Sequence, residues 1–213
     1  MNKTNATIYF AKLPEIMDPK NFEYSVDLFL AEIKLGILRH DSTHVTRRYE
    51  YPFILRNILP AAWLKILDAG GGESVLGPYL AQWNTVVNLD NTSYVAPLMN
   101  RLTGRLPNYS AVEGDIRQIP YPDNYFDFTI CVSVLEHLPK DQIRLALNEL
   151  LRVTSGKLLI TMDILESQFS VNDLRTLIYP MQIENTPQTL FTLKNGAQEE
   201  IFTIAYLIYE GIK

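Results

Sequence analysis

The chain has 213 residues, with 19 basic and 24 acidic side chains and a formal net charge of −5. That length suits one domain with a cap, or two small domains, and 47% of the residues are apolar, which is enough for a substantial core. The weakly acidic balance argues against general nucleic-acid binding, and the single cysteine, Cys131, excludes an internal disulfide and a cysteine-based zinc site.

The first sixty residues are predicted to form a small N-terminal helical cap. Residues 1–20 are polar and are expected to be loosely attached. From Asn21 to His40, apolar residues recur at three- and four-residue steps, which predicts a helix. After a polar interruption, residues 52–60 predict a short helix that Pro52 opens and Pro60 ends. The apolar stripe of the first helix consists of Phe22, Val26, Phe29, Leu30, Ile33 and Ile37.

From residue 61 onward, strand and helix patterns alternate. Gly156 is expected to stop the helix that precedes it. Such alternation predicts βαβ units and a mainly parallel sheet with helices on both faces. The strand candidates are residues 63–69, 85–90, 109–115, 125–134, 157–164 and 199–213, and the helix candidates are residues 73–83, 93–104, 140–154 and 171–179.

Three consecutive glycines follow the first of these strands, in LDAGGGESVLG (residues 67–77). In an open α/β sheet, ligands bind beyond the carboxyl ends of the strands, and bare backbone at Gly70 and Gly72 would let a ligand approach closely. The dinucleotide fingerprint fails because Val75 stands where Gly or Ala belongs, and because Glu73 would repel a pyrophosphate. The P-loop is excluded since no Gly-Lys-Ser/Thr follows. A cationic ligand is compatible with the turn.

The motif Asp68-x-Gly70-x-Gly72 at the end of a first strand resembles the first motif of class I S-adenosylmethionine-dependent methyltransferases. The resemblance extends over residues 64–165, where Asp90 ends the second strand, Gly-Asp follows the third, and Leu-Glu-His-Leu begins the next helix. It implies a doubly wound, Rossmann-like α/β sheet of seven mostly parallel strands, with the last strand antiparallel. The implied domains are the cap, residues 1–60, and the S-adenosylmethionine-binding domain, residues 61–213. Ser74 departs from the pattern, since a third glycine is common there.

The resemblance also implies a role for each motif residue toward S-adenosylmethionine. Gly70 and Gly72 would lie against its methionine part. Asp90 would accept hydrogen bonds from both ribose hydroxyls, as a charged acceptor facing a diol. Asp115 would accept from the adenine amino group, and Ile116 would pack on the ring. The implied cofactor-binding residues are Asp68, Gly70, Gly72, Asp90, Asp115, Ile116 and Ser133.

Ordinary structural explanations stand beside these roles. Asp90 can instead cap the next helix, and Asp115 can be a turn aspartate. Asp127 is expected to be structural, His137 to pack or to cap rather than to catalyse, and Cys131 to be an inert buried thiol.

The linker between the cap helices holds further candidates. His40 and His44 are four residues apart, but no carboxylate motif accompanies them, so no metal site is predicted. Arg47–Arg48 are expected in solvent. Tyr49 and Tyr51 are either filling residues or aromatic faces lying over the sulfonium or the substrate.

Methyl transfer from a sulfonium is an in-line displacement with a neutral leaving group. The main contribution of the protein is then orientation, which can supply about 7–11 kcal/mol. A general base matters only for some acceptors, so no catalytic residue is assigned. The short segments around the site predict a small-molecule acceptor that is methylated at oxygen or nitrogen.

Two alternatives stay open: a catalytically silent cofactor-binding or partner-binding subunit with the same fold, and a nucleotide-dependent oxidoreductase. The N-terminal residues lack the apolar core of a signal peptide, and no run approaches the ~20 apolar residues that span a bilayer. With the lone cysteine, this predicts a cytoplasmic protein without a membrane span.

Overall fold

The computed structural model describes residues 5–12, 18–37, 46–165, 170, 172–174, 182–183, 191–195 and 198–210. Its helices are α1 (Pro19–Leu35), α2 (Arg47–Ile58), α3 (Leu76–Leu80), α4 (Val95–Met99) and α5 (Lys140–Val153), with 3-10 turns η3 (Asn100–Leu102) and η4 (Leu135–His137). Its strands are β1 (Asn5–Phe10), β2 (Lys65–Ala69), β3 (Thr85–Asp90), β4 (Tyr109–Glu113), β5 (Phe126–Val132), β6 (Thr154–Leu165), β7 (Gln182–Ile183), β8 (Phe191–Asn195) and β9 (Gln198–Glu210).

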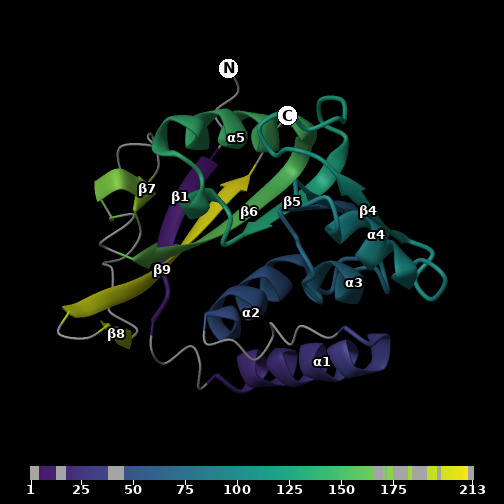
Figure 1. The fold of residues 1–213 in the computed structure, drawn as a ribbon, viewed down its shortest axis with the longest axis horizontal. Coiled ribbons are helices and arrows are strands. Elements are labelled where there is room, and N and C mark those ends of the chain that lie inside the picture. The colour runs from purple at the N-terminus through teal and green to yellow at the C-terminus, as the bar shows by residue number, and fades with distance from the viewer. Residues whose placement is uncertain are drawn as a thin grey trace.

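All nine strands in the described part of the chain join one sheet, in the order β4-β3-β2-β5-β6-β9-β1-β7, with β8 paired to β9 (Figure 1). The strands from β4 to β6 are parallel, and β9 is antiparallel to β6. The prediction of a doubly wound, mostly parallel Rossmann-like sheet is therefore confirmed. The sheet has more than the seven expected strands because β1 and β7 extend it past β9, and β8 also pairs with β9.

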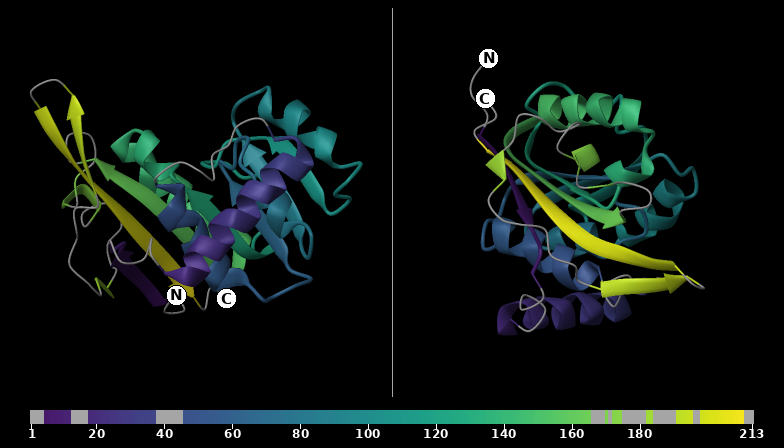
Figure 2. Two further views of the ribbon diagram at one scale, coloured as in Figure 1. Left: turned by 90° about the horizontal axis from the view of Figure 1, so that it is seen from below. Right: turned by 90° about the vertical axis from the view of Figure 1, so that its left-hand side faces the viewer.

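Strand β1 comes from a segment that was expected to be loosely attached. It pairs antiparallel with β9 along its whole length, from Asn5 opposite Glu210 to Phe10 opposite Ala205. The pairing covers an edge of β9 that would otherwise present unpaired backbone groups. Residues 1–60 thus contribute a strand to the sheet as well as two helices. The hairpin of β8 and β9 extends away from the helices (Figure 2).

Neighbouring residues of the central strands face two separate cores. In β2, Ile66 packs in the core with α1, α2, α3 and α4, while Leu67 packs in the core with α5. The same alternation in β5 places Cys131 on the α5 side, fully buried as expected. Helices therefore cover both faces of the sheet, with α5 on one side and α1 and α2 on the other (Figure 1).

Several boundaries differ from the sequence predictions, and two of the differences have a clear structural consequence. Helix α2 begins at Arg47 rather than at Pro52, so the proline lies inside the helix. Gly156 does not stop α5, which ends at Val153, but lies within β6. A Cβ at Gly156 would lie 2.5 Å from the carbonyl oxygen of Asp127, so the glycine lets β6 approach β5.

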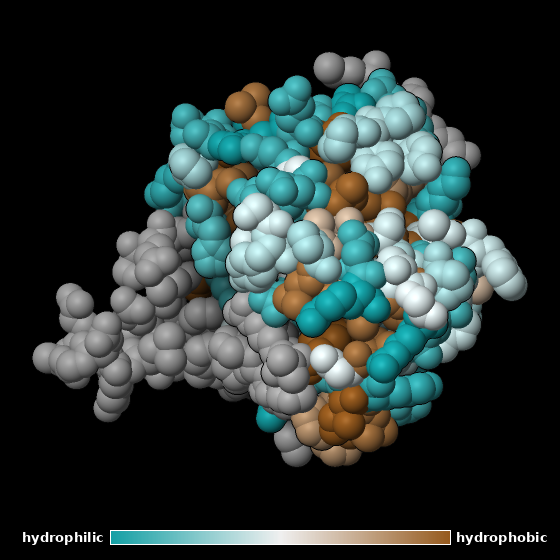
Figure 3. Space-filling model, turned by 45° about the vertical axis from the view of Figure 1, so that its right-hand side comes forward, coloured by the Kyte–Doolittle hydropathy of each residue, from teal (hydrophilic) through white to brown (hydrophobic). Residues whose placement is uncertain are grey.

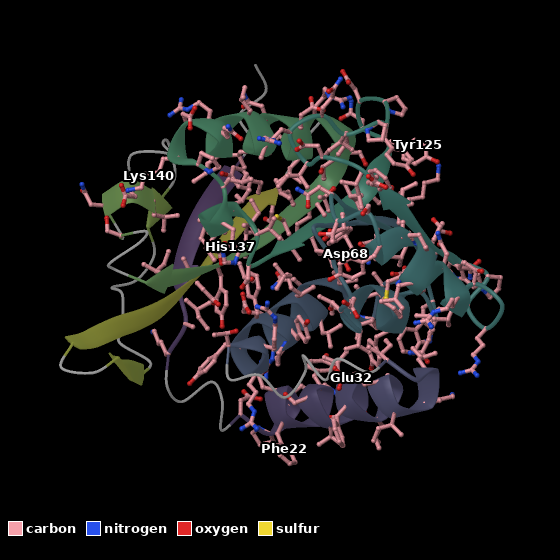
Figure 4. The ribbon with its side chains drawn as sticks, in the orientation of Figure 1. Phe22, Glu32, Asp68, Tyr125, His137 and Lys140 are labelled. Carbon is pink, nitrogen blue, oxygen red and sulfur yellow. The ribbon has the colours of Figure 1, made fainter. Side chains whose placement is uncertain are left out.

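The first predicted helix is present, but its apolar stripe lies on the outside. The buried face of α1 consists of Asn21, Tyr24, Leu28 and Glu32, which look toward α2 and α3. Of the stripe that predicted the helix, only Ile37 is buried. Figure 4 shows Phe22 pointing away from the body of the molecule. His40, His44 and most of residues 171–179 lie outside the described residues.

Candidate ligand site at the glycine turn

The glycine turn lies at the carboxyl end of β2, between β3 and β5. Gly70 and Gly72 have φ angles of 74° and 54°, in the left-handed region that side chains disfavour. Gly70 is also tightly packed, since a Cβ there would lie 2.6 Å from Cγ2 of Val134. A Cβ on Gly72 would meet only Oδ2 of Asp90, at 3.9 Å. The backbone at Gly72 is therefore open to a ligand.

Asp68 lies beneath this turn and is almost fully buried. Its Oδ2 and the Oδ1 of Asn88 have no hydrogen-bond partner among the described atoms. Both oxygens face Gly71, since a Cβ there would lie 2.6 Å from Oδ2 of Asp68 and 2.8 Å from Oδ1 of Asn88. Burial, and then the charge of Asp90, raise the pKa of Asp68 to about 7. Protonation would remove the cost of burying a charge at this position.

Asp90 ends β3 and faces the turn. Its Oδ2 accepts from the backbone N–H of Gly72 at 3.1 Å, and its Oδ1 accepts from the N–H of Thr92 at 2.8 Å. The second contact is the local turn role that the sequence left open, and the first ties the carboxylate to the glycine turn. Carboxylate oxygens have further lone pairs, so Asp90 can also accept from a ligand.

Asp115 follows β4 and is clamped by Arg117. The Arg117 Nε lies 2.8 Å and 2.9 Å from the two carboxylate oxygens, and its backbone N–H donates to Oδ1 at 2.8 Å. The side-chain hydrogen bond with Arg117 holds the pKa of Asp115 below its usual range. Asp115 is therefore a fixed, ionised acceptor beside the buried Ile116.

Two adjoining cavities lie at this end of the sheet. One has a volume of about 300 Å³ and the other, against the glycine turn, about 220 Å³. Gly70, Ser133 and His137 line both, so the cavities are parts of one elongated site. The first is also lined by Asp90, Asp115 and Ile116, and the second by Arg47, Tyr51, Asp68 and Gly72. All seven residues implied by the resemblance therefore meet at this site.

Arg47 was expected in solvent, and this is wrong. It forms an ion pair with Glu50, whose side chain is completely buried. Its Nη1 also donates to Oγ of Ser133 at 2.7 Å, and Ser133 donates to Glu50 at 2.6 Å. Thr161 in β6 donates to the same carboxylate. The network draws Arg47 inward because the buried charge of Glu50 requires a cation and hydrogen-bond donors.

Ser133 is the strained member of this network. Its φ is 51°, a left-handed value that is uncommon for a residue other than glycine. Its backbone N–H donates to the carbonyl of Thr161 at 3.0 Å, which holds the end of β5 against β6. The serine hydroxyl thus lies between the cavities and the buried carboxylate of Glu50.

Two further carboxyl groups lie behind the network. The N–H of Asp163 donates to Oε1 of Glu136 at 2.8 Å, while Glu136 Oε2 and Asp163 Oδ1 have no partner among the described atoms. Burial, and then the charge of Glu50, raise the pKa of Asp163 to about 8. Burial and the neighbouring Asp163 also raise the pKa of Glu136. Both shifts favour the protonated form of these groups.

Of the tyrosine and histidine candidates, Tyr51 and His137 line the site and Tyr49 does not. Tyr51 lines the cavity at the turn, and its hydroxyl lies 2.9 Å from Oγ of Ser74, the residue that departs from the family motif. Tyr49 lies in another cluster with Phe53 and Tyr206. His137 is exposed and lines both cavities (Figure 4), so it belongs to the site although its expected role was packing or capping.

Asp127 has the structural role expected of it. Its Oδ2 accepts from the backbone N–H of Lys65 at 2.8 Å. Among the residues that the structure describes, no group of three or more His, Cys, Asp and Glu side chains could hold a metal ion. Within the same residues, no helix combines the length and the hydropathy needed to cross a bilayer.

Comparison with known proteins agrees with this arrangement. Residues 67–160 match the family model described as a methyltransferase domain. A search of curated proteins finds no match.

Similar solved structures include YcgJ from Bacillus subtilis, at 15% identity and a TM-score of 0.59 over 75% of this chain and 96% of that one. A SAM-dependent methyltransferase from Methanosarcina mazei matches at 16% identity and a TM-score of 0.57, over 75% and 98% of the two chains. Magnesium protoporphyrin IX methyltransferase from Synechocystis, solved with bound SAM, matches at 17% identity and a TM-score of 0.52, over 92% of this chain and 98% of that one. At these identities the likeness establishes the fold.

The open α/β sheet, with its ligand site at the carboxyl ends of β2, β3 and β5, defines a protein of the Rossmann-like class. Residues 67–160, which match the methyltransferase-domain model, contain the glycine turn, Asp90 and Asp115, so the part of the chain that forms this site is similar to a methyltransferase domain.

Proposed function

We propose that this protein is a class I S-adenosylmethionine-dependent methyltransferase, which transfers the methyl group of S-adenosylmethionine to an oxygen or nitrogen of a small-molecule acceptor by in-line displacement. The observation that carries the proposal is the convergence of two fixed carboxylates, Asp90 and Asp115, with an open glycine turn around one elongated site. The weak acidity of the chain disfavours nucleic acid as acceptor. The cytoplasmic location remains a prediction from the sequence, as does the boundary between residues 1–60 and 61–213.

The residues fit a nucleoside that carries an amino-acid tail. Asp90 is placed to accept from ribose hydroxyls, and Asp115 and Ile116 to hold the base in the same cavity. Gly70 and Gly72 leave backbone bare for the tail, and Asp68 supports the turn from below. The proposed cofactor-binding residues are Asp68, Gly70, Gly72, Asp90, Asp115, Ile116 and Ser133.

We add Arg47 to this set, as the partner of the cofactor carboxylate. Its guanidinium lines the cavity at the glycine turn, and all of its described hydrogen bonds to Thr46, Glu50 and Ser133 use one nitrogen, Nη1. A guanidinium has five N–H donors, so it can engage an anion at the same time. Glu50 raises the pKa of Arg47 despite its burial, which keeps it charged.

When bound, S-adenosylmethionine supplies an activated methyl group. The chain then needs mainly to orient the cofactor and the acceptor, and to exclude water from the site. Tyr51 and Arg47 of α2 line the cavity at the glycine turn, so α2 covers this part of the site. Ser133 and His137 line both cavities, so they would lie near the junction between the nucleoside and the amino-acid tail of the cofactor. No general base is assigned.

Calorimetry with two ligands tests the assignment. Asp90→Ala is expected to weaken binding of both S-adenosylmethionine and methylthioadenosine, by roughly 1.5–3 kcal/mol for a lost charged hydrogen bond. Arg47→Met combined with Glu50→Gln, which leaves no unpaired buried charge, is expected to weaken only S-adenosylmethionine, since methylthioadenosine has no carboxylate.

Asp123→Ala, at an exposed carboxylate outside both cavities, is the matched control. Unchanged binding in the Asp90 variant would remove that residue from the ribose site. Turnover is then tested by mass spectrometry with hydroxyl and amine acceptors. Cofactor binding without any transfer would favour the silent subunit.

A further inference from the structure

The hydroxyl groups of Tyr51 and Ser74 meet at the wall of the cavity at the glycine turn. Their oxygens lie 2.9 Å apart, and both residues line that cavity. Tyr51 belongs to α2 and is almost fully buried, whereas Ser74 follows the turn itself, 23 positions further along the chain. This hydrogen bond therefore joins helix α2 directly to the backbone on which the ligand site is built.

Ser74 is fixed independently of Tyr51. Its backbone N–H donates to the carbonyl of Gly71 at 3.1 Å, and its Oγ accepts from the N–H of Leu76 at 3.0 Å. A hydroxyl has one donor and two acceptor positions, so Oγ can bind Leu76 and Tyr51 at the same time. Glycine, which is common at this position in the family that the motif resembles, could make neither hydroxyl contact. Ser74 thus gives the turn a link to α2 that glycine could not form.

Tyr51 in turn lies beside Arg47. The two residues are four positions apart on α2, so their side chains are neighbours on one face of the helix. The guanidinium carbon of Arg47 lies 5.8 Å from the centroid of the Tyr51 ring, within the range of a cation–π contact. Nη1 of Arg47 also donates to Glu50 and Ser133. The position of the cation at the cavity therefore depends on the Tyr51 ring as well as on these polar partners.

We propose that Tyr51 and Ser74 are positioning residues for the amino-acid tail of S-adenosylmethionine. Their hydrogen bond holds α2 at the glycine turn, and thereby keeps Arg47 at the cavity that would receive the tail. A site that is ordered before binding loses less conformational entropy when the ligand arrives, so the link raises the affinity for the tail. The inference rests on the proposed function, because it takes this cavity as the place of the tail.

Packing holds α2 in the fold without the Tyr51 hydroxyl. Ile54 and Leu55 of α2 are fully buried in the core that the helix shares with α1 and β2. Figure 3 shows further hydrophobic residues at the lower end of the molecule, where α1 lies in Figure 1, but these are exposed and lie outside that core. Tyr51→Phe keeps the ring and this packing, so it removes the link and leaves the helix in place.

Two thioether ligands separate a role at the tail from a role in folding. S-adenosylhomocysteine carries the amino-acid tail, and methylthioadenosine has the same nucleoside without it. Tyr51→Phe and Ser74→Ala are each expected to raise the dissociation constant of S-adenosylhomocysteine about three- to tenfold, as for the loss of one hydrogen bond. The dissociation constant of methylthioadenosine is expected to stay within about twofold of the parent value. Calorimetry on the whole chain measures both constants.

A double-mutant cycle tests whether the two hydroxyls act through each other. Tyr51→Phe combined with Ser74→Ala is expected to bind S-adenosylhomocysteine no more weakly than the weaker single variant, since either change alone breaks the link. Ser74→Thr keeps a hydroxyl and is expected to bind within about twofold of the parent.

The matched control is Tyr79→Phe, on α3. Tyr79 is also a buried tyrosine whose hydroxyl is bonded to another element, through Asp27 of α1, but it lines neither cavity at the turn. We expect Tyr79→Phe to lower the unfolding midpoint and to leave both dissociation constants unchanged.

The outcomes separate failure of this inference from failure of the proposed function. If the parent binds S-adenosylhomocysteine more tightly than methylthioadenosine and Tyr51→Phe leaves that ratio unchanged, the inference is wrong and the proposed function stands. Equal weakening of both ligands, or additive effects of Tyr51→Phe and Ser74→Ala, would overturn the inference in favour of a purely structural contact. A parent that binds neither ligand, or binds both equally, would remove the tail site and this inference with it.

Discussion

At the scale of single residues, the protonation of Asp68 bears on the stability of the fold. Its pKa in the folded protein, about 7, lies above the usual aspartate value of 3.8. Between about pH 4 and 7, Asp68 is therefore more protonated in the folded state than in the unfolded state. The contribution of Asp68 to the free energy of unfolding falls as the pH rises through this range. Above pH 7, the folded chain holds a buried carboxylate next to the unpaired Oδ1 of Asn88.

Asp68→Asn is expected to remove this dependence, because an amide of the same shape stays uncharged at every pH. The variant should be more stable than the parent at pH 8, on the order of a few kcal/mol, and the difference should vanish toward pH 4. Urea unfolding of both proteins from pH 4 to 8 measures it. Asp163 and Glu136 titrate in both proteins, so only the difference isolates Asp68. A constant difference across this range would contradict the assignment.

The residues at the site were partly predictable. Gly70, Gly72 and Asp90 follow strands, and parallel strands bring their carboxyl ends together, so local pattern and topology suffice. Glu50 was missed because its partners Ser133 and Thr161 are 83 and 111 positions away. The available signal was an acidic residue inside an apolar run, three positions after an arginine.

At the scale of elements, Gly156 controls how closely β6 approaches β5. The pairing between these strands is irregular between Phe126 and Phe128, where Gly156 faces the carbonyl of Asp127. Gly156→Ala is expected to reduce the free energy of unfolding by about 1–3 kcal/mol, because its Cβ would overlap that carbonyl and force the strands apart.

Gly104→Ala is the matched control, since a Cβ there would meet nothing within 4 Å. Guanidinium unfolding measures both variants, and an equal effect in the two would show that backbone entropy, not strand approach, dominates. The sequence assigned Gly156 to a helix stop because glycine commonly follows a helix. A close contact between two strands depends on the neighbouring strand, so the local sequence around Gly156 does not indicate it.

At the scale of the whole molecule, the cap and the sheet are joined more closely than their sequences suggest. Alternating patterns located the five parallel strands from β4 to β6, since each is bounded by its own turn. They did not locate β7 or β8, nor β1, whose pairing with β9 joins the two ends of the described chain. Local patterns also could not show which side of α1 is buried, since polar Asn21 and Glu32 face inward while the apolar stripe faces out.

The position of β1 leads to a prediction for the whole chain. Removing residues 1–11 would leave β9 with an unpaired edge, which is a template for association with other chains. We expect a lower unfolding midpoint and light scattering that grows with protein concentration. S-adenosylmethionine affinity of the folded fraction should be preserved, because no residue of β1 lines either cavity. An unchanged midpoint without scattering would mean that β1 contributes little, whereas lost affinity in a folded variant would show that the strand at the far side of the sheet also organises the glycine turn.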